Sequence, residues 1–389
     1  MRAKCLALLI LPVLVACGGA QEASPPAAAG RVALAAHAPL GSQPVTPAVA
    51  QARDEILGPD ALNPAEVRLW WFGVSGFIVS LGGHLFLMDA WESVGLHADY
   101  VPIGREELAA IAPEAIFIGH GHFDHAADAG YIAGRSGALV VGSEEICTTA
   151  KDDAAAEGMD GNFECLITGT AESPLPGTIQ QAKIWEDLPP VEILQHLHSA
   201  ATNEAHDPGT PFVHVPNLLP FITHLNLDPA EYQRFFASLG DPQGGTWAYH
   251  FRVGDFSLLW HDSTGPINSG SDPFSEAVQV ALESFTDCVD VQLGAIVGFN
   301  QPVNGLRDPR LYVAHARPKV FLPSHHDAWA PVVGGGATAY EAQWRAEIAS
   351  LPQPPELDYL RDPEDYMQVR RYVVDDPRWK PATPGSRCE

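Results

Sequence analysis

The chain has 389 residues, 46% of them hydrophobic, which is enough to bury a large core in one domain or in two. It carries 22 basic and 48 acidic residues, so its formal net charge is -26. A field of this sign repels phosphate backbones, and the composition therefore opposes nucleic-acid partners and the processing of DNA or RNA.

The first 65 residues precede the main predicted domain. Arg2 and Lys4 are followed by an apolar run over 6–16, which is too short to span a bilayer and is typical of a secretory signal. The sequence Leu14-Val15-Ala16-Cys17 resembles the bacterial lipoprotein cleavage box, which implies removal of residues 1–16 and a lipid on Cys17. An ordinary signal peptide is the alternative. Residues 17–65, rich in Ala, Pro, Gly and Ser, are expected to form a flexible tether. We therefore expect a lipid-anchored protein of the bacterial cell envelope, and we predict no protein partner.

Strands and helices are expected to alternate along the first half of the domain. Residues 115–118 are an apolar run typical of a buried strand, 126–135 predict a short helix, and 139–141 predict the next strand. Residues 152–176 are richer in Gly, Asp and Glu and are expected to form an excursion at the surface. The alternation is typical of an α/β layer fold.

The second half continues this pattern. The sequence predicts a hairpin, because two apolar-rich runs meet at Gly254-Asp255, a two-residue turn signal. Asp228 is expected to cap a helix. The expected strands are 191–194, 247–253, 256–260, 289–297 and 319–322, the helices are 229–239 and 274–285, the long loop is 203–220, and the chain from 352 is expected to wrap the surface.

The densest chemical signal is Gly119-His120-Gly121-His122-Phe123-Asp124-His125, which directly follows the strand predicted over 115–118. Three imidazoles and a carboxylate within six residues are the ligands that zinc and related ions prefer. The alternative is a polar loop that happens to be rich in His. The crowding favours a metal site.

The pattern His-x-His-x-Asp-His after a strand resembles the signature of the metallo-β-lactamase fold hydrolases. Three further segments are similar to that family: the runs 67–79 and 82–89 resemble its paired opening strands, the predicted hairpin leads to His261-Asp262-Ser263, and the strand 319–322 leads to Pro323-Ser324-His325-His326. The resemblance implies a four-layer αββα sandwich and one catalytic domain over 66–389.

The resemblance also implies two zinc ions, with Mn²⁺ or iron as alternatives. His120 and His122 would bind one ion together with a third His, for which we predict His198 and keep His196 as the rival. The second ion would take Asp124, His125 and His325, and Asp262 would bridge the two. Asp124 is also the predicted catalytic residue, because it would steer the water. Asp89 is expected either to orient a ligand His or to be a plain turn residue.

The cysteines predict disulfides. Four remain once Cys5 leaves with the signal and Cys17 is acylated, and an even number in an exported chain suggests pairing. Of three connectivities, the preferred one joins Cys147 with Cys165 and Cys288 with Cys388.

The predicted function is hydrolysis. Two divalent ions lower the pKa of a shared water toward neutrality and supply metal-bound hydroxide, which would attack an ester, lactone, amide or phosphodiester in a small molecule or a lipid. The opening Trp-Phe-Gly-x-Ser-Gly and the ending Pro-Ser-His-His-Asp-Ala-Trp look closer to ascorbate phosphate lactonases and N-acyl phosphatidylethanolamine phospholipase D than to true β-lactamases. The alternatives are a mononuclear iron oxygenase on the same fold and a non-catalytic lipoprotein that binds a metal or a ligand.

Overall fold

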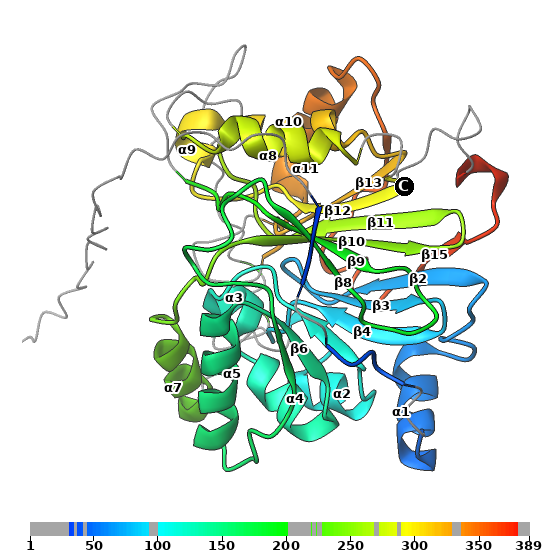
Figure 1. Ribbon diagram of the computed structural model, residues 1–389, viewed down its shortest axis with the longest axis vertical. Coiled ribbons are helices and arrows are strands. Elements are labelled where there is room, and N and C mark those ends of the chain that lie inside the picture. Colours follow the sequence, from blue (N-terminus) through cyan, green and yellow to red (C-terminus); the bar gives the residue numbers. More distant parts are fainter. Residues whose placement is uncertain are drawn as a thin grey trace, which may run out of the picture.

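The computed structural model describes residues 31–34, 37–41, 45–92, 100–200, 219, 223, 228–267, 272–285, 289–328 and 336–379. The predicted signal peptide, the lipid-bearing Cys17 and nearly all of the long loop over 203–220 lie outside these residues. Within them, two β-sheets pack face to face with helices on their outer faces (Figure 1).

The larger sheet has eight strands in the order β1-β8-β9-β10-β11-β12-β13-β14. Strands β10 and β11 form an antiparallel pair whose register ends at Val253 and Phe256, so the predicted hairpin is confirmed. The strands from β11 to β14 run parallel to one another. Their bounds are β1 Arg31–Ala33, β8 Ile179–Ala182, β9 Val191–Gln195, β10 Trp247–Val253, β11 Phe256–His261, β12 Val291–Ala295, β13 Val320–Ser324 and β14 Glu356–Leu357.

The second sheet has seven strands in the order β15-β2-β3-β4-β5-β6-β7. Its first four strands pair antiparallel, and β4 to β7 pair parallel. Nearly every residue of β2 to β6 is buried, as expected for strands covered on both faces. The bounds are β2 Glu66–Trp71, β3 Phe77–Leu81, β4 His84–Met88, β5 Ala115–Phe117, β6 Leu139–Gly142, β7 Cys165–Ile167 and β15 Arg370–Val373.

Helices cover the outer faces of both sheets (Figure 1). On one side α8, α10 and α11 lie over the larger sheet, and on the other α2, α4 and α5 lie over the smaller one. The predicted αββα sandwich is therefore confirmed. The helix bounds are α1 Pro47–Leu57, α2 Arg105–Ala110, α3 Phe123–Ala126, α4 Ala129–Ser136, α5 Glu144–Ala156, α7 Pro229–Ser238, α8 Ser275–Glu283, α9 Gln301–Asn304, α10 Arg307–Ala316 and α11 Thr338–Ala349.

The main core fills the space between the sheets. Phe86 of β4 and Phe117 of β5 each place a ring 4.9 Å, centroid to centroid, from the ring of Phe251 in β10. Aromatic contacts of this kind add to the burial of apolar surface that holds the two sheets together. This packing fixes the relative positions of the strand ends, and the His-rich motif follows one of these ends.

Part of the predicted tether is folded. Residues 31–33 form β1, which pairs in parallel with β8, and 47–57 form α1, which begins at Pro47 after a Thr46 cap. Arg53 of this helix donates hydrogen bonds to the carbonyls of Ile111 and Ala112. The prediction for 17–65 is therefore wrong for these segments, because partners distant in sequence stabilise them.

Two further expectations are corrected. Residues 152–156 are the last turn of α5, and 165–167 form the edge strand β7, so the segment 152–176 is not simply a surface excursion. The chain beyond 352 supplies β14 to one sheet and β15 to the other, and Trp379 is fully buried. Both corrections involve short elements that form only by pairing with the rest of the fold.

The cysteine prediction is also corrected. Cys147 in α5 and Cys165 in β7 are free thiols that hydrogen-bond to each other, and they are not joined by a disulfide. Cys288 and Cys388 lie outside the described residues. Among the described helices, none has the length and apolar character that crossing a bilayer requires.

Candidate metal centre

Four strand ends meet at one edge of the sandwich. The loops after β5, β9, β11 and β13 carry, in that order, the His-rich motif, His198, Asp262 and His325. The backbone ties these loops together, since Trp247 donates to the carbonyl of Gly119 and His196 donates to that of Thr246. Residues up to 205 positions apart in the chain thus converge.

His120, His122 and His198 form the first group. The Nε2 atom of His120 lies 2.9 Å from Nδ1 of His122 and 3.2 Å from Nε2 of His198. A shared proton can link only one such pair of imidazole nitrogens at a time. A cation bound to all three lone pairs satisfies the whole group.

Asp124, His125 and His325 form the second group. The Nε2 atoms of the two imidazoles lie 3.2 Å apart, and Asp124 Oδ2 lies 3.4 Å from the first and 3.2 Å from the second. Asp262 lies between the groups, because its carboxylate approaches His120 of one at 2.7 Å and His125 of the other at 3.3 Å. The structure thus brings all seven predicted ligands together in three overlapping groups.

The outer nitrogens of the imidazoles have partners that set the tautomer. Nδ1 of His198 lies 2.8 Å from the Ser199 carbonyl, and Nδ1 of His125 lies 2.7 Å from Asp89 Oδ2. A carbonyl or carboxylate accepts a hydrogen bond, so the proton resides on Nδ1 and the Nε2 lone pair faces the centre. This is the arrangement that a metal ligand needs.

Asp89 has the orienting role that was one of its two predicted readings. Its carboxylate accepts hydrogen bonds from Gly119 N–H at 3.1 Å, from Ser75 Oγ at 2.8 Å and from His125 Nδ1. Burial, followed by the charge of Asp262, raises the pKa of Asp89 to about 7. Gly119 has a separate reason to be glycine, because a Cβ there would overlap the carboxylate of Asp262.

Backbone strain is concentrated at this edge. Val74, Asp89 and His325 have φ values of 49°, 57° and 63°, a region that a β-branched residue such as Val rarely adopts. Val74 is held there from both sides: its N–H donates to the Asp327 carboxylate at 3.2 Å, and its carbonyl accepts from His325 N–H at 2.7 Å. The clamp holds the Val74 loop against the His325 loop.

The charges around the centre keep the first group neutral. Burial, together with the neighbouring imidazoles, lowers the pKa values of His120, His122 and His198. For Asp124, burial acts to raise the pKa, but His125 and His325 outweigh it and hold it well below its ordinary value. Neutral imidazole and ionised carboxylate are the protonation states that bind metal.

The residues fit a pair of divalent ions. Asp262 is 1% exposed, and its Oδ1 atom is buried with no hydrogen-bond partner in the described part of the chain. A buried carboxylate oxygen without a donor costs free energy unless a cation compensates for it. Five imidazoles and two carboxylates in this arrangement suit zinc, manganese or iron.

The rival ligand His196 lies outside the groups. Its Nδ1 lies 3.0 Å from the Tyr312 hydroxyl, and burial followed by the charge of His261 lowers its pKa to about 3. Tyr312 also contacts the Leu197 carbonyl and Gly265 N–H, so it joins the His198 loop to the Asp262 loop. This tyrosine comes from α10, and no local signal in the sequence indicates its role.

Two other supporting residues were also missed. Ser75 lies 3.0 Å from His125 Nδ1, and the Trp-Phe-Gly-x-Ser-Gly run was its only signal. Asp128, within the helix predicted over 126–135, is 1% exposed and is ion-paired with Arg105 and Arg234. Its signal was its place directly after the metal motif.

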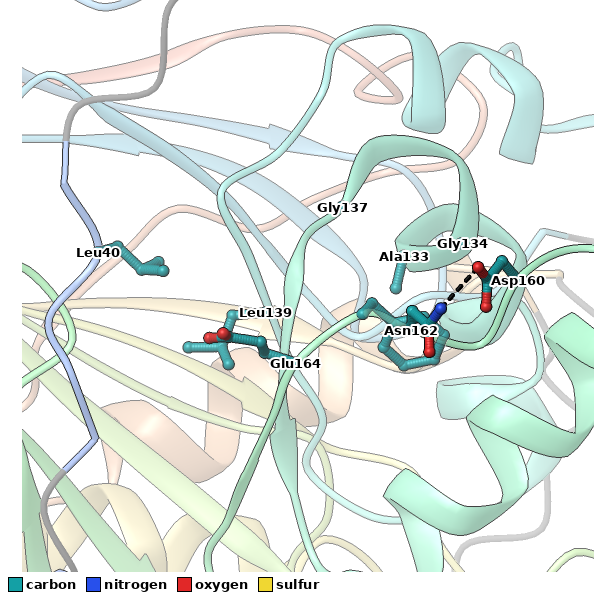
Figure 2. Close-up of a pocket in the computed structure, with 9 residues that line it drawn as sticks. Leu40, Ala133, Gly134, Gly137, Leu139, Asp160, Asn162 and Glu164 are labelled. Atoms are coloured by element: carbon teal, nitrogen blue, oxygen red, sulfur yellow. Dashed lines mark hydrogen bonds between the residues drawn. The ribbon is translucent and has the colours of Figure 1, made fainter.

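A surface hollow elsewhere is separate from the centre. It has a volume of about 420 Å³, and Asn162 donates to Asp160 on its wall at 2.6 Å (Figure 2). None of its lining residues belongs to the metal groups. The residues that line it are Leu40, Ala133, Gly134, Gly137, Leu139, Asp160, Asn162, Phe163 and Glu164.

Comparison with known proteins agrees with the fold and the motif. Residues 70–211 match the family model described as the metallo-beta-lactamase superfamily. This match covers the strands from β3 to β9 and the His-rich motif, and the two-sheet sandwich agrees with it.

Proteins described as metal-dependent hydrolases match a shorter part of the chain. One from Pyrobaculum neutrophilum is 39% identical over 80 residues, which are 21% of this chain and 34% of that protein. One from Myxococcus xanthus is 34% identical over 89 residues, which are 23% of this chain and 30% of that protein. The chain thus spans about a third of the length of these relatives.

Solved structures resemble the chain at low sequence identity. A metallo hydrolase from Ignicoccus hospitalis is 14% identical, with 79% of this chain and 98% of that one covered and a TM-score of 0.47. A diiron β-hydroxylase from Streptomyces venezuelae is 12% identical, with 80% and 54% covered and a TM-score of 0.42.

Proposed function

We propose that this protein is a metal-dependent hydrolase that binds two divalent ions, zinc in the first place, and cleaves an ester, lactone, amide or phosphodiester. One observation carries the proposal. Asp262 lies between two complete three-residue groups, and its Oδ1 atom has no hydrogen-bond partner among the described residues. The complete second group opposes a mononuclear oxygenase.

Different residues of the centre would have different roles in the reaction. Bound ions would lower the pKa of a water and stabilise negative charge on the substrate oxygen. Asp124 is placed to orient that water, because its ionised carboxylate lies in the second group and is 7% exposed. Asp89 and Ser75 hold the ring of His125 in one orientation. Asp262 contacts both groups and so fixes their positions relative to each other.

Metal content and turnover, measured together, test the proposal. We expect about two zinc ions per chain by elemental analysis and hydrolysis of at least one of a lactone, a carboxyl ester, a β-lactam and a phosphodiester. Asp124→Ala should lower kcat/KM by roughly a thousandfold. Asp153→Asn, which changes a carboxylate on α5 outside the metal groups, is the control and should keep full activity. A single iron, or bound metal without turnover on any substrate, would contradict the proposal.

We further propose that a lipid on Cys17 tethers the enzyme to a membrane of the cell envelope. The cleavage-box sequence supports this location. In a bacterial host, Cys17→Ser should move the protein from the membrane fraction to the soluble fraction and abolish labelling with a radioactive fatty acid. Retention of the label would contradict the lipid site.

A further inference from the structure

The candidate centre is more open on one side than on the other. His120, His125 and Asp262 are each 1% exposed, whereas His122 and His198 are only half-buried. A substrate must therefore reach the centre past the two half-buried imidazoles. Side chains next to these two residues are the first that it meets.

Phe299 lies on that side. Its side chain is 67% exposed, which makes it the most exposed large hydrophobic residue in the described part of the chain. Its ring centroid lies 5.9 Å from that of His198. Single exposed apolar side chains are common on protein surfaces, so the position beside a metal-group imidazole is the informative fact.

Hydrogen bonds hold Phe299 in this position. Its N–H donates to Ser199 Oγ at 3.2 Å, and Ser199 N–H in turn donates to Ser263 Oγ at 3.1 Å. Asn300 donates to the Asp308 carboxylate at 2.6 Å and to the Thr264 carbonyl at 3.3 Å. The backbone that carries the Phe299 ring is thus tied to both the His198 loop and the Asp262 loop, so little backbone entropy would be lost when a ligand packs on the ring.

The metal loop itself also carries an apolar side chain with apolar neighbours. Phe123, between His122 and Asp124, packs edge-on against Trp91 at 6.0 Å and against Phe235 of α7 at 5.2 Å. The guanidinium groups beside this loop, Arg105 and Arg234, are ion-paired with Asp128 and Glu92. These contacts favour a substrate whose body is apolar and uncharged.

We infer that Phe299 is a specificity-determining residue, and that the centre acts on uncharged carboxylic esters, lactones or amides whose acyl group carries an apolar ring. The inference rests on the proposed function and narrows it to a substrate class. The ring of the substrate would pack on Phe299 while its carbonyl lies at the metal groups.

A pair of esters that differ only in the acyl group tests this inference. Wild type should cleave methyl phenylacetate with a kcat/KM about tenfold above that for methyl acetate, because one ring contact buries on the order of 50 Å² of apolar surface. Phe299→Ala should remove this preference, mainly through KM, and change the value for methyl acetate less than twofold. Phe299→Leu should restore part of it, and zinc content should stay constant.

A binding measurement separates recognition from chemistry. Benzyl methyl ketone presents the same ring and carbonyl with no bond to hydrolyse, and calorimetry should show about tenfold weaker binding to Phe299→Ala than to wild type. Phe236→Ala is the matched control, since it removes the same side chain at a similar exposure of 64% on α7 and should change nothing.

The outcomes distinguish this inference from the proposed function. Equal losses for both esters in Phe299→Ala, unchanged ketone binding, or faster cleavage of the anionic diester methyl phenyl phosphate would overturn the inference and leave the hydrolase standing. No turnover of any ester, lactone, amide or phosphodiester by the zinc-loaded protein would overturn both.

Discussion

A buried imidazole can bind a cation only when one ring nitrogen keeps its lone pair, and the hydrogen bond to the other nitrogen decides which one does. In this protein the Ser199 carbonyl and the Asp89 carboxylate accept hydrogen bonds from Nδ1 of His198 and of His125, so the lone pair of each ring is on Nε2. In His196, Nδ1 contacts the Tyr312 hydroxyl. Its Nε2 atom is buried without a partner in the described part of the chain. The surroundings of Nε2 therefore separate the two histidines, because Nε2 of His198 lies 3.2 Å from His120 Nε2 and His196 belongs to none of the metal groups.

The two neighbouring histidines should respond differently to substitution. We expect His198→Ala to lower the zinc content from about two ions per chain to about one, because the first group loses one of three ligands. His196→Ala should keep both ions and lower the free energy of unfolding, since it leaves a cavity in the core. Elemental analysis and urea unfolding measure the two effects. Loss of zinc in His196→Ala with retention in His198→Ala would reverse the assignment.

Glu192 should make stability depend on pH. Burial raises the pKa of this β9 carboxyl, but His250 and Arg31 outweigh it and lower the pKa from 4.5 to about 2. A lowered carboxyl pKa stabilises the fold above pH 4.5, and this contribution is lost as the pH falls through about 2. Glu192→Gln should therefore destabilise the protein at pH 7 by about 3 kcal/mol in urea unfolding, and by less at pH 3.5. The exposed Glu164→Gln is the control, and a pH-independent difference would contradict the argument.

At the scale of elements, close packing of α4 on α5 supports the metal loop. Gly130 of α4 lies against the backbone carbonyl of Ala150 in α5, whereas Gly134, one turn later, faces the flexible end of Met159. The Cys147 and Cys165 thiols meet where the same helix, α5, crosses β7. The position of the loop after β5 thus depends on helices that follow it in the chain.

Two glycines of one helix allow a matched test of this packing. Gly130→Ala should cost about 2 kcal/mol or more in the free energy of unfolding, because its Cβ would overlap backbone that cannot rotate away. Gly134→Ala should be neutral or stabilising, since Met159 can move and alanine favours a helix interior. Urea unfolding of both variants measures the difference, and equal effects would contradict the packing argument.

At the scale of the whole molecule, the centre joins the two sheets. The seven-stranded sheet contributes the His-rich motif, and the eight-stranded sheet contributes His198, Asp262 and His325. Bound cations would therefore stabilise the sandwich as a unit, and they would also offset part of the net charge of -26.

Removal of metal should lower the thermal stability. A ligand present at a hundred times its Kd stabilises the folded state by about 2.7 kcal/mol, so a chelator should lower the Tm of the zinc-loaded protein by about 3 °C or more. Asp124→Ala, with its second group incomplete, should show a smaller decrease in differential scanning calorimetry. Equal decreases in wild type and variant would place the stabilising ion elsewhere.

The hairpin at Gly254-Asp255 and the metal motif could be predicted from the sequence because each depends on residues within one short segment, and the fold class followed from the alternation of strands and helices along the chain. The structure alone placed β1, β14 and β15, since short strands become stable only by pairing with partners far away in the chain. It also left His196, the predicted rival of His198, outside the metal groups, and it brought Tyr312 and Phe299 against these two histidines. Hydrogen bonds and burial between distant segments decide these positions, and no local pattern records them.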